Sequence, residues 1–221
     1  MFRAGIQILT ILGFISIVSC KSRIIDKPIH FDNQRKELTR EYIKDHYGLE
    51  VENIKIDPKI IVLHWTAIPT LQGSFNAFNY DTLPAARKDI AKASRLNVSI
   101  QFLVDRDGTI YRLMPEDFMA RHVIGLNYNA IGIENVGGTP ETPLTNDQLK
   151  ANIWLVNYLN RKYNIEYLIG HYEYTKFEGS DLWKELNDNY RTEKTDPGEE
   201  FMRKVREAVK DQNLKSAPAK N

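Results

Sequence analysis

The stretch Pro58–Ala67, PKIIVLHWTA, decides the fold class of this chain. Its residues Ile60–Leu63 are all apolar, with no polar residue between them. A strand covered on one face alternates apolar and polar side chains, whereas a strand buried on both faces is apolar throughout. The run therefore predicts an interior strand of a sheet with both faces covered, and this strand ends at a polar residue, His64.

Three later stretches also predict strands. Residues 98–114, VSIQFLVDRDGTIYRLM, have apolar segments on both sides of Asp107-Gly108, a dipeptide that favours a tight hairpin turn. The stretches AIGIENVGG (residues 130–138) and EYLIGHYEY (residues 166–174) each contain a short apolar run that favours a strand. One hairpin among strands that are otherwise separated by helices predicts a mixed sheet.

Helical patterns lie between these strands. Gln34–Tyr47 has its apolar residues on one side and is stopped by Gly48. Residues 70–83, with glycine, asparagine and aspartate, predict a loop. Pro84 then opens a short alanine-rich helix that runs to about residue 96.

A longer helix follows a capping box formed by Thr145 and Gln148. The apolar residues of its buried face are Leu149, Ile153, Val156 and Leu159. A final helix follows Asp196. These elements together predict a single α/β domain with a central mixed β-sheet flanked by helices.

The charge of the chain is balanced, with 30 Lys and Arg against 29 Asp and Glu among 221 residues. No long basic run is present, so the sequence does not favour a nucleic-acid partner. The length is sufficient for one domain with a substantial core. The predicted organisation is a signal peptide (1–19), a lipid-anchored tether (20–33), the folded domain (34–211) and a flexible tail (212–221).

The first twenty residues, MFRAGIQILTILGFISIVSC, have the pattern of an export signal. One charge, Arg3, precedes an apolar run over residues 6–18, and Cys20 is the single cysteine of the chain. The motif Ile17-Val18-Ser19-Cys20 resembles a bacterial lipobox, which implies cleavage before Cys20 and a lipid anchor on that cysteine. An ordinary signal peptide is the alternative. The next residue, Lys21, is not acidic, which favours an anchor in the outer membrane facing the periplasm.

Three predicted strands end in a polar residue: His64, Glu134 and His171. The carboxyl ends of parallel strands meet at one edge of a sheet, so these side chains are expected to lie together. Asp196 could complete the group. Two imidazoles and one carboxylate can bind Zn²⁺ and leave a fourth position open, and the same ligand types suit ferrous iron.

Asp196 has a second interpretation. Aspartate is a common N-cap, Pro197 suits the first position of a helix, and Glu199 lies at the third position of a capping box. The pattern alone leaves both roles open. His30 and His46 lie in the predicted tether and the first helix, and a structural role is favoured for both.

Five stretches of the chain resemble, in the same order, the type 2 class of zinc-dependent N-acetylmuramoyl-L-alanine amidases, a family that includes peptidoglycan recognition proteins. They are IVLHWTA, FLVDRDGTIYRLM, RHVIGLNYNAIGIENVGG, LIGHYE and KTDPG, and they cover about Ile60 to Val209. The resemblance implies one Zn²⁺ held by His64, His171 and Asp196. It implies Glu134 as the general base and Lys194 as the partner of the developing oxyanion.

The resemblance also implies a substrate, the amide bond between N-acetylmuramic acid and L-alanine in peptidoglycan. The predicted residues of the substrate groove are His122, Asn129 and Trp65. Residues 179–193 make the segment between His171 and Asp196 longer than in compact relatives. Two interpretations of this segment are open: a wall of the cleft that alters substrate choice, or a surface insertion without a role. Three alternatives remain: a peptidoglycan-binding module without activity, a zinc peptidase that cuts the stem peptide, and a structural lipoprotein that keeps the fold without zinc or activity.

Overall fold

The structure, a computed structural model, describes residues 23–83 and 93–219. The predicted signal peptide, the lipidation residue Cys20 and most of the predicted helix after Pro84 lie outside the described residues. Within the described ranges, no helix has both the length and the apolar character needed to cross a bilayer.

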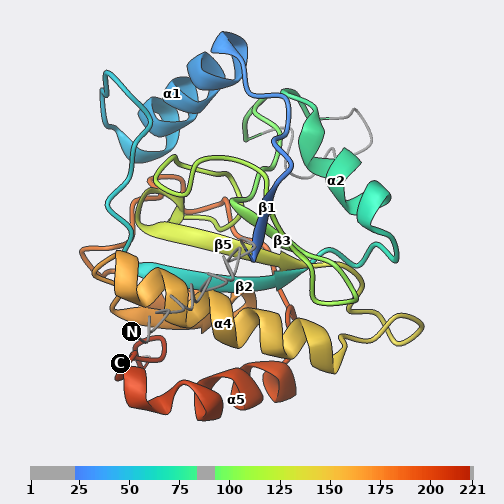
Figure 1. Ribbon diagram of the computed structural model, residues 1–221. Coiled ribbons are helices and arrows are strands. Elements are labelled where there is room, and N and C mark those ends of the chain that lie inside the picture. The colour runs from blue at the N-terminus through green and yellow to red at the C-terminus, as the bar shows by residue number, and fades with distance from the viewer. Residues whose placement is uncertain (1–22, 84–92, 220–221) are drawn as a thin grey trace, which may run out of the picture.

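The core of the fold is one six-stranded sheet with the strand order β1-β4-β3-β5-β2-β6 (Figure 1). Only the hairpin of β3 and β4 is antiparallel, and all other pairs are parallel, which confirms the predicted mixed sheet. The strands are β1 (Ile24–Asp26), β2 (Ile60–Trp65), β3 (Phe102–Val104), β4 (Ile110–Arg112), β5 (Ala130–Asn135) and β6 (Tyr167–Gly170).

Strand β2 lies between β5 and β6 and runs parallel to both. Its residues Ile60–Leu63 are fully buried, as the unbroken apolar run predicted. The register places His64 beside Glu134 of β5 and Leu63 beside Gly170 of β6. Three chain segments therefore bring polar side chains to the carboxyl end of one central strand.

The helices cover both faces of the sheet. On one face, α4 (Asn146–Lys162) and α5 (Glu199–Ala208) lie side by side, and α1 (Asn33–Tyr47) and α2 (Leu71–Asn79) lie on the opposite side of the molecule (Figure 1). The capping box of α4 is present, and α1 ends at Gly48 in the left-handed conformation, as predicted. Three 3-10 helices complete the described elements: η1 (Asn127–Asn129), η2 (His171–Phe177) and η3 (Lys210–Gln212).

The prediction of a loop over residues 70–83 was wrong, because this segment contains α2. The side chain of Thr70 accepts a hydrogen bond from the backbone N–H of Gly73 and so caps the helix. Phe78 belongs to a core cluster that includes Leu103 of β3, and Leu71 and Phe75 pack against this cluster. This tertiary packing outweighs the low helix propensity of the glycine and asparagine residues in the segment.

Parts of the predicted tether and tail belong to the fold. Within residues 20–33, β1 pairs with β4, and Ile29 is buried. Within residues 212–221, the backbone N–H of Leu168 donates to Lys215, and the N–H of Lys215 donates to Glu166, over 3.0 and 2.8 Å. The sequence predicted a tether and a flexible tail here, but backbone hydrogen bonds to β4 and β6 hold parts of both segments in the fold.

Candidate metal centre

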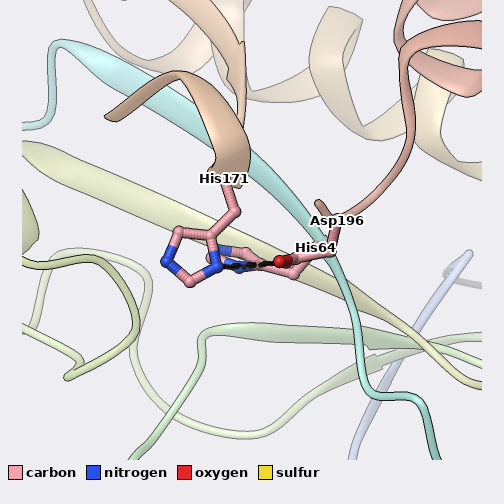
Figure 2. A group of neighbouring side chains, drawn as sticks. All are labelled: His64, His171 and Asp196. Atoms are coloured by element: carbon pink, nitrogen blue, oxygen red, sulfur yellow. Dashed lines mark hydrogen bonds and ion pairs between the residues drawn. The ribbon is translucent and has the colours of Figure 1, made fainter. Parts of the chain in front are cut away.

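Three side chains from distant parts of the sequence converge at the carboxyl end of β2 (Figure 2). His64 lies on β2, His171 is the first residue of η2 directly after β6, and Asp196 lies in the turn before α5. The Nδ1 atoms of the two histidines are 3.0 Å apart. Asp196 Oδ2 lies 3.2 Å from Nδ1 of His64 and 3.0 Å from Nδ1 of His171.

This geometry fits a metal ion. Ligand atoms that bind Zn²⁺ tetrahedrally at about 2.0–2.2 Å lie roughly 3.3–3.6 Å apart, and the three observed separations are within a few tenths of an ångström of that range. Two imidazole nitrogens and one carboxylate oxygen also form a donor set that zinc accepts. Hydrogen bonds explain the arrangement less well, because one carboxylate oxygen faces two ring nitrogens that also face each other.

The electrostatics of the three residues favour the protonation states that a metal requires. All three residues are buried. Burial, together with the neighbouring His171, lowers the pKa of His64 to about 4, so that its imidazole is neutral at neutral pH. Burial alone would raise the pKa of Asp196, but the adjacent His171 and His64 lower it well below the usual range.

Asp196 does not cap the final helix, so this part of the sequence-based interpretation was wrong. Helix α5 begins at Glu199, its N-cap is Gly198, and no side chain makes the cap hydrogen bond. The carboxylate of Asp196 faces His64 and His171 instead. The helix therefore begins three residues after Asp196, so Asp196 does not occupy the N-cap position.

A cavity of about 430 Å³ opens over the candidate metal ligands. Glu134 and Lys194, the predicted base and oxyanion partner, both line it together with the three ligands. Glu134 is the register neighbour of His64 on the adjacent strand, and Lys194 precedes Asp196 by two residues. The cavity is thus lined by both side chains to which the family resemblance assigns catalytic roles.

The three predicted groove residues have different positions. Trp65 lines the cavity at the end of β2. Its ring packs directly on the loop after β5, since a Cβ at Gly138 in this loop would lie 2.3 Å from Cγ of Trp65. His122 lines the cavity and contacts His64. Asn129 precedes β5, at the opposite end of this strand from Glu134, and its side chain donates to the carbonyl oxygen of Leu182.

A family model described as N-acetylmuramoyl-L-alanine amidase matches residues 55–199, well over half of the sequence. The chain belongs to this family. The matched range contains every candidate ligand together with Glu134 and Lys194. Membership in this amidase family supports the hydrolysis or binding of peptidoglycan amides.

Solved structures of amidases and related proteins are similar to the chain. The amidase LysC from Clostridium intestinale URNW is 26% identical, with a TM-score of 0.47, and the match covers 72% of this chain and 88% of LysC. A selenomethionine derivative of AmpD is 25% identical, with a TM-score of 0.47 and coverage of 69% and 84%. The human PGRP-IBETAC in complex with glycosamyl muramyl pentapeptide is 18% identical, with a TM-score of 0.48 and coverage of 69% and 84%. No curated protein sequence matches the chain.

Part of the amidase cavity wall comes from the long segment between the second and third candidate ligands. Tyr190 and Thr192 of this segment line the cavity. The hydroxyl of Tyr190 accepts a hydrogen bond from Arg121, which is buried and also lines the cavity. The sequence did not single out Tyr190 or Arg121, although an aromatic residue within the 179–193 segment was a signal that could have been used.

A buried pair holds this wall segment against α1. Nδ1 of His46 lies 2.9 Å from both carboxylate oxygens of Glu185, and its Nε2 lies 2.9 Å from the carbonyl oxygen of Ala93. The ring of His46 also packs beside Tyr190. His46 therefore has a structural role, as expected, and His30 likewise pairs with a neighbour, Asp81.

We expect Glu185→Leu to lower the free energy of unfolding by about 1–3 kcal/mol at pH 6, because it leaves the buried imidazole of His46 without its partner. Burial alone would lower the pKa of His46, but its hydrogen bonds to Glu185 and Ala93 raise it overall. A histidine with a raised pKa stabilises the fold fully at pH values below its pKa in the unfolded chain, which is about 6.5. This contribution to the free energy of unfolding is lost as the pH rises through the pKa in the folded state.

Urea denaturation of the wild type and the variant at pH 6 and pH 9 measures this effect. The difference between the two proteins is expected to shrink at the higher pH. The exposed residue Glu193 lies in the same segment, so Glu193→Leu is the control and is expected to change stability by less than about 0.5 kcal/mol. A difference that grows with pH would contradict the assignment.

Proposed function

We propose that this chain is a zinc-dependent amidase that hydrolyses the bond between N-acetylmuramic acid and L-alanine in peptidoglycan. The observation that carries the proposal is the convergence of three ligand atoms, all within 3.2 Å of one another, in a cavity that also contains Glu134 and Lys194. Membership in the N-acetylmuramoyl-L-alanine amidase family supports the reaction class.

His64, His171 and Asp196 would hold the metal. A bound zinc ion would supply a Lewis acid that activates water at neutral pH and polarises the amide carbonyl. Glu134 would accept the proton of the attacking water and then transfer it to the leaving nitrogen of the amide. This transfer is needed because an amide nitrogen is a poor leaving group until it is protonated.

Lys194 would stabilise the negative charge that develops on the carbonyl oxygen. Its side chain is half-buried in the cavity, and within the described residues it forms no ion pair that would neutralise it. Its charge also reaches the candidate metal centre, since it contributes to lowering the pKa of His64. A lysine in this position is suited to a charge that appears only during the reaction.

We expect Lys194→Met to lower kcat by roughly 10²–10³-fold, the usual effect of removing one donor to an oxyanion. Methionine keeps the length and much of the apolar stem of lysine, so the cavity wall should be preserved. Steady-state kinetics on a purified muropeptide would measure the loss, with zinc affinity measured in parallel. A variant that lost zinc instead would show that Lys194 supports the metal centre rather than the reaction.

Digestion of purified peptidoglycan sacculi, with and without a chelator, tests the proposed function. We expect free stem peptides that begin with L-alanine, no cleavage in the chelator, and recovery when zinc is added. Product masses that correspond to cuts within the stem would indicate a peptidase. Binding of sacculi without release of products would indicate a recognition module.

We also propose that the protein is exported and anchored through lipid on Cys20. Support comes from the sequence alone, in the apolar run before the motif Ile17–Cys20 and in the absence of a second cysteine. Such an anchor would place the amidase in the cell envelope, where its polymer substrate lies. Labelling with a radioactive fatty acid in cells is expected for the wild type and not for Cys20→Ser.

A further inference from the structure

The candidate ligand His64 is engaged at both of its ring nitrogens. Its Nδ1 faces His171 and Asp196, and its Nε2 lies 3.0 Å from Nδ1 of a fourth residue, His122. The two rings of His64 and His122 are nearly perpendicular, at 85°, with centroids 5.1 Å apart. His122 therefore contacts the metal centre from the side opposite the metal position.

The direction of this hydrogen bond follows from the ligand role of His64. A ligand nitrogen needs its lone pair, so Nδ1 of His64 cannot bear a proton and Nε2 must bear it. The Nε2–H group then donates to Nδ1 of His122, which must itself be unprotonated. The contact thus fixes one tautomer in each ring.

The backbone around His122 is firmly held. Asn127 Oδ1 accepts hydrogen bonds from the backbone N–H groups of His122 and Val123, both at 2.8 Å, and Asn127 Nδ2 donates to the hydroxyl of Tyr47 over 2.9 Å. The three hydrogen bonds of the buried Asn127 therefore hold the backbone from which the side chain of His122 extends.

Gly132 of β5 determines where that ring can lie. A Cβ at this position would lie 2.8 Å from Nδ1 and 2.9 Å from Cε1 of His122, so the ring packs directly on the backbone of the strand. The same Cβ would lie 2.1 Å from Cδ1 of Ile100. The ring therefore occupies a place that depends on the absence of a side chain in β5.

We infer that His122 is a positioning residue that accepts a hydrogen bond from His64 and thereby orients this ligand toward the metal. The inference rests on the proposed function, and it deepens it by adding an outer partner to the ligand set. Partners of this kind hold a ligating histidine in one tautomer and orientation, and their loss typically weakens metal binding by about 10–100-fold. It also gives His122 a role beyond the substrate contact that was expected, carried by its Nδ1, which faces His64.

The test compares His122→Asn with His122→Leu. The two new side chains have the same branched shape, but only asparagine offers an oxygen acceptor near the position of Nδ1. Zinc affinity is measured by competition with a chromophoric chelator, on protein whose folding is checked by thermal unfolding. We expect the leucine variant to bind zinc about 10–100-fold more weakly than the wild type and the asparagine variant to bind within a few-fold of it.

A second measurement does not depend on any variant. In the zinc-loaded wild type with ¹⁵N-labelled histidine, His64 is expected to show a protonated Nε2 and a metal-bound Nδ1. The opposite tautomer would overturn the inference, as would a leucine variant that binds zinc normally and only has a raised KM for muropeptide. Equal weakening in the asparagine and leucine variants would also overturn it. Failure of the wild type to bind zinc would instead overturn the proposed function.

Discussion

Replacing Glu134 with glutamine is expected to lower kcat for amide cleavage by roughly 10²–10⁴-fold, the range that proton transfer by a positioned side chain contributes. Glutamine has nearly the same shape as glutamate but cannot accept the proton of the attacking water. Glu134 lines the cavity beside His64, yet it is not one of the three clustered ligands. The loss should therefore appear in kcat while zinc affinity stays close to that of the wild type.

Single-turnover kinetics on a purified muropeptide and a zinc titration of the same sample measure both quantities. Glu141 lies in an exposed loop beyond the end of β5, so Glu141→Gln is a matched control that is expected to retain full activity. Two results would contradict the assignment of Glu134 as the base. One is loss of zinc in Glu134→Gln, and the other is retention of most of its turnover.

Asp196→Ala is expected to lower zinc affinity by more than about 10²-fold, since even the loss of an outer partner of a ligand costs up to that amount. The substitution removes the one oxygen that lies within 3.2 Å of both imidazole nitrogens. It also removes the one negative charge of the ligand set. Activity at micromolar zinc should disappear and return in part only at high zinc concentrations.

The metal content of the purified variant and a competition titration with a chelator measure this loss. Asp181→Ala, in the exposed part of the segment between the ligands, is the control and should bind zinc normally. Normal zinc binding in Asp196→Ala would remove Asp196 from the ligand set. The proposed function would then need a different third ligand among the residues of the cavity.

Much of the site could be predicted because its information is local. The apolar run of β2 identified the central strand. The polar residues at or directly after the carboxyl ends of β2, β5 and β6 indicated the edge of the sheet at which the candidate site lies. Parallel strands align their carboxyl ends, so the amino-acid sequence alone is enough to expect His64 and Glu134 side by side. The assignment of Asp196 as a ligand also required the resemblance to the amidase family, because its local sequence pattern is that of a helix cap.

Other features depend on contacts between residues distant in the sequence. The pair of His46 and Glu185 joins residues 139 positions apart, and neither has a local pattern that indicates the other. Helix α2 was missed because its apolar residues pack in a core cluster with distant residues such as Leu103 of β3, and its local sequence does not indicate these contacts. Asn129 does not line the cavity although Asn127 does, because its side chain donates a hydrogen bond to the carbonyl oxygen of Leu182, 53 positions later in the sequence.

The attachment of the C-terminal segment to β6 has a practical consequence. Strand β6 is an edge strand of the sheet. The backbone of Lys215 forms hydrogen bonds with the backbone of Glu166 and Leu168, which could otherwise pair with another chain. Unpaired outer strands promote self-association. A version of the protein that stopped at residue 211 would keep every candidate active-site residue, but it would expose this strand and so favour aggregation during purification.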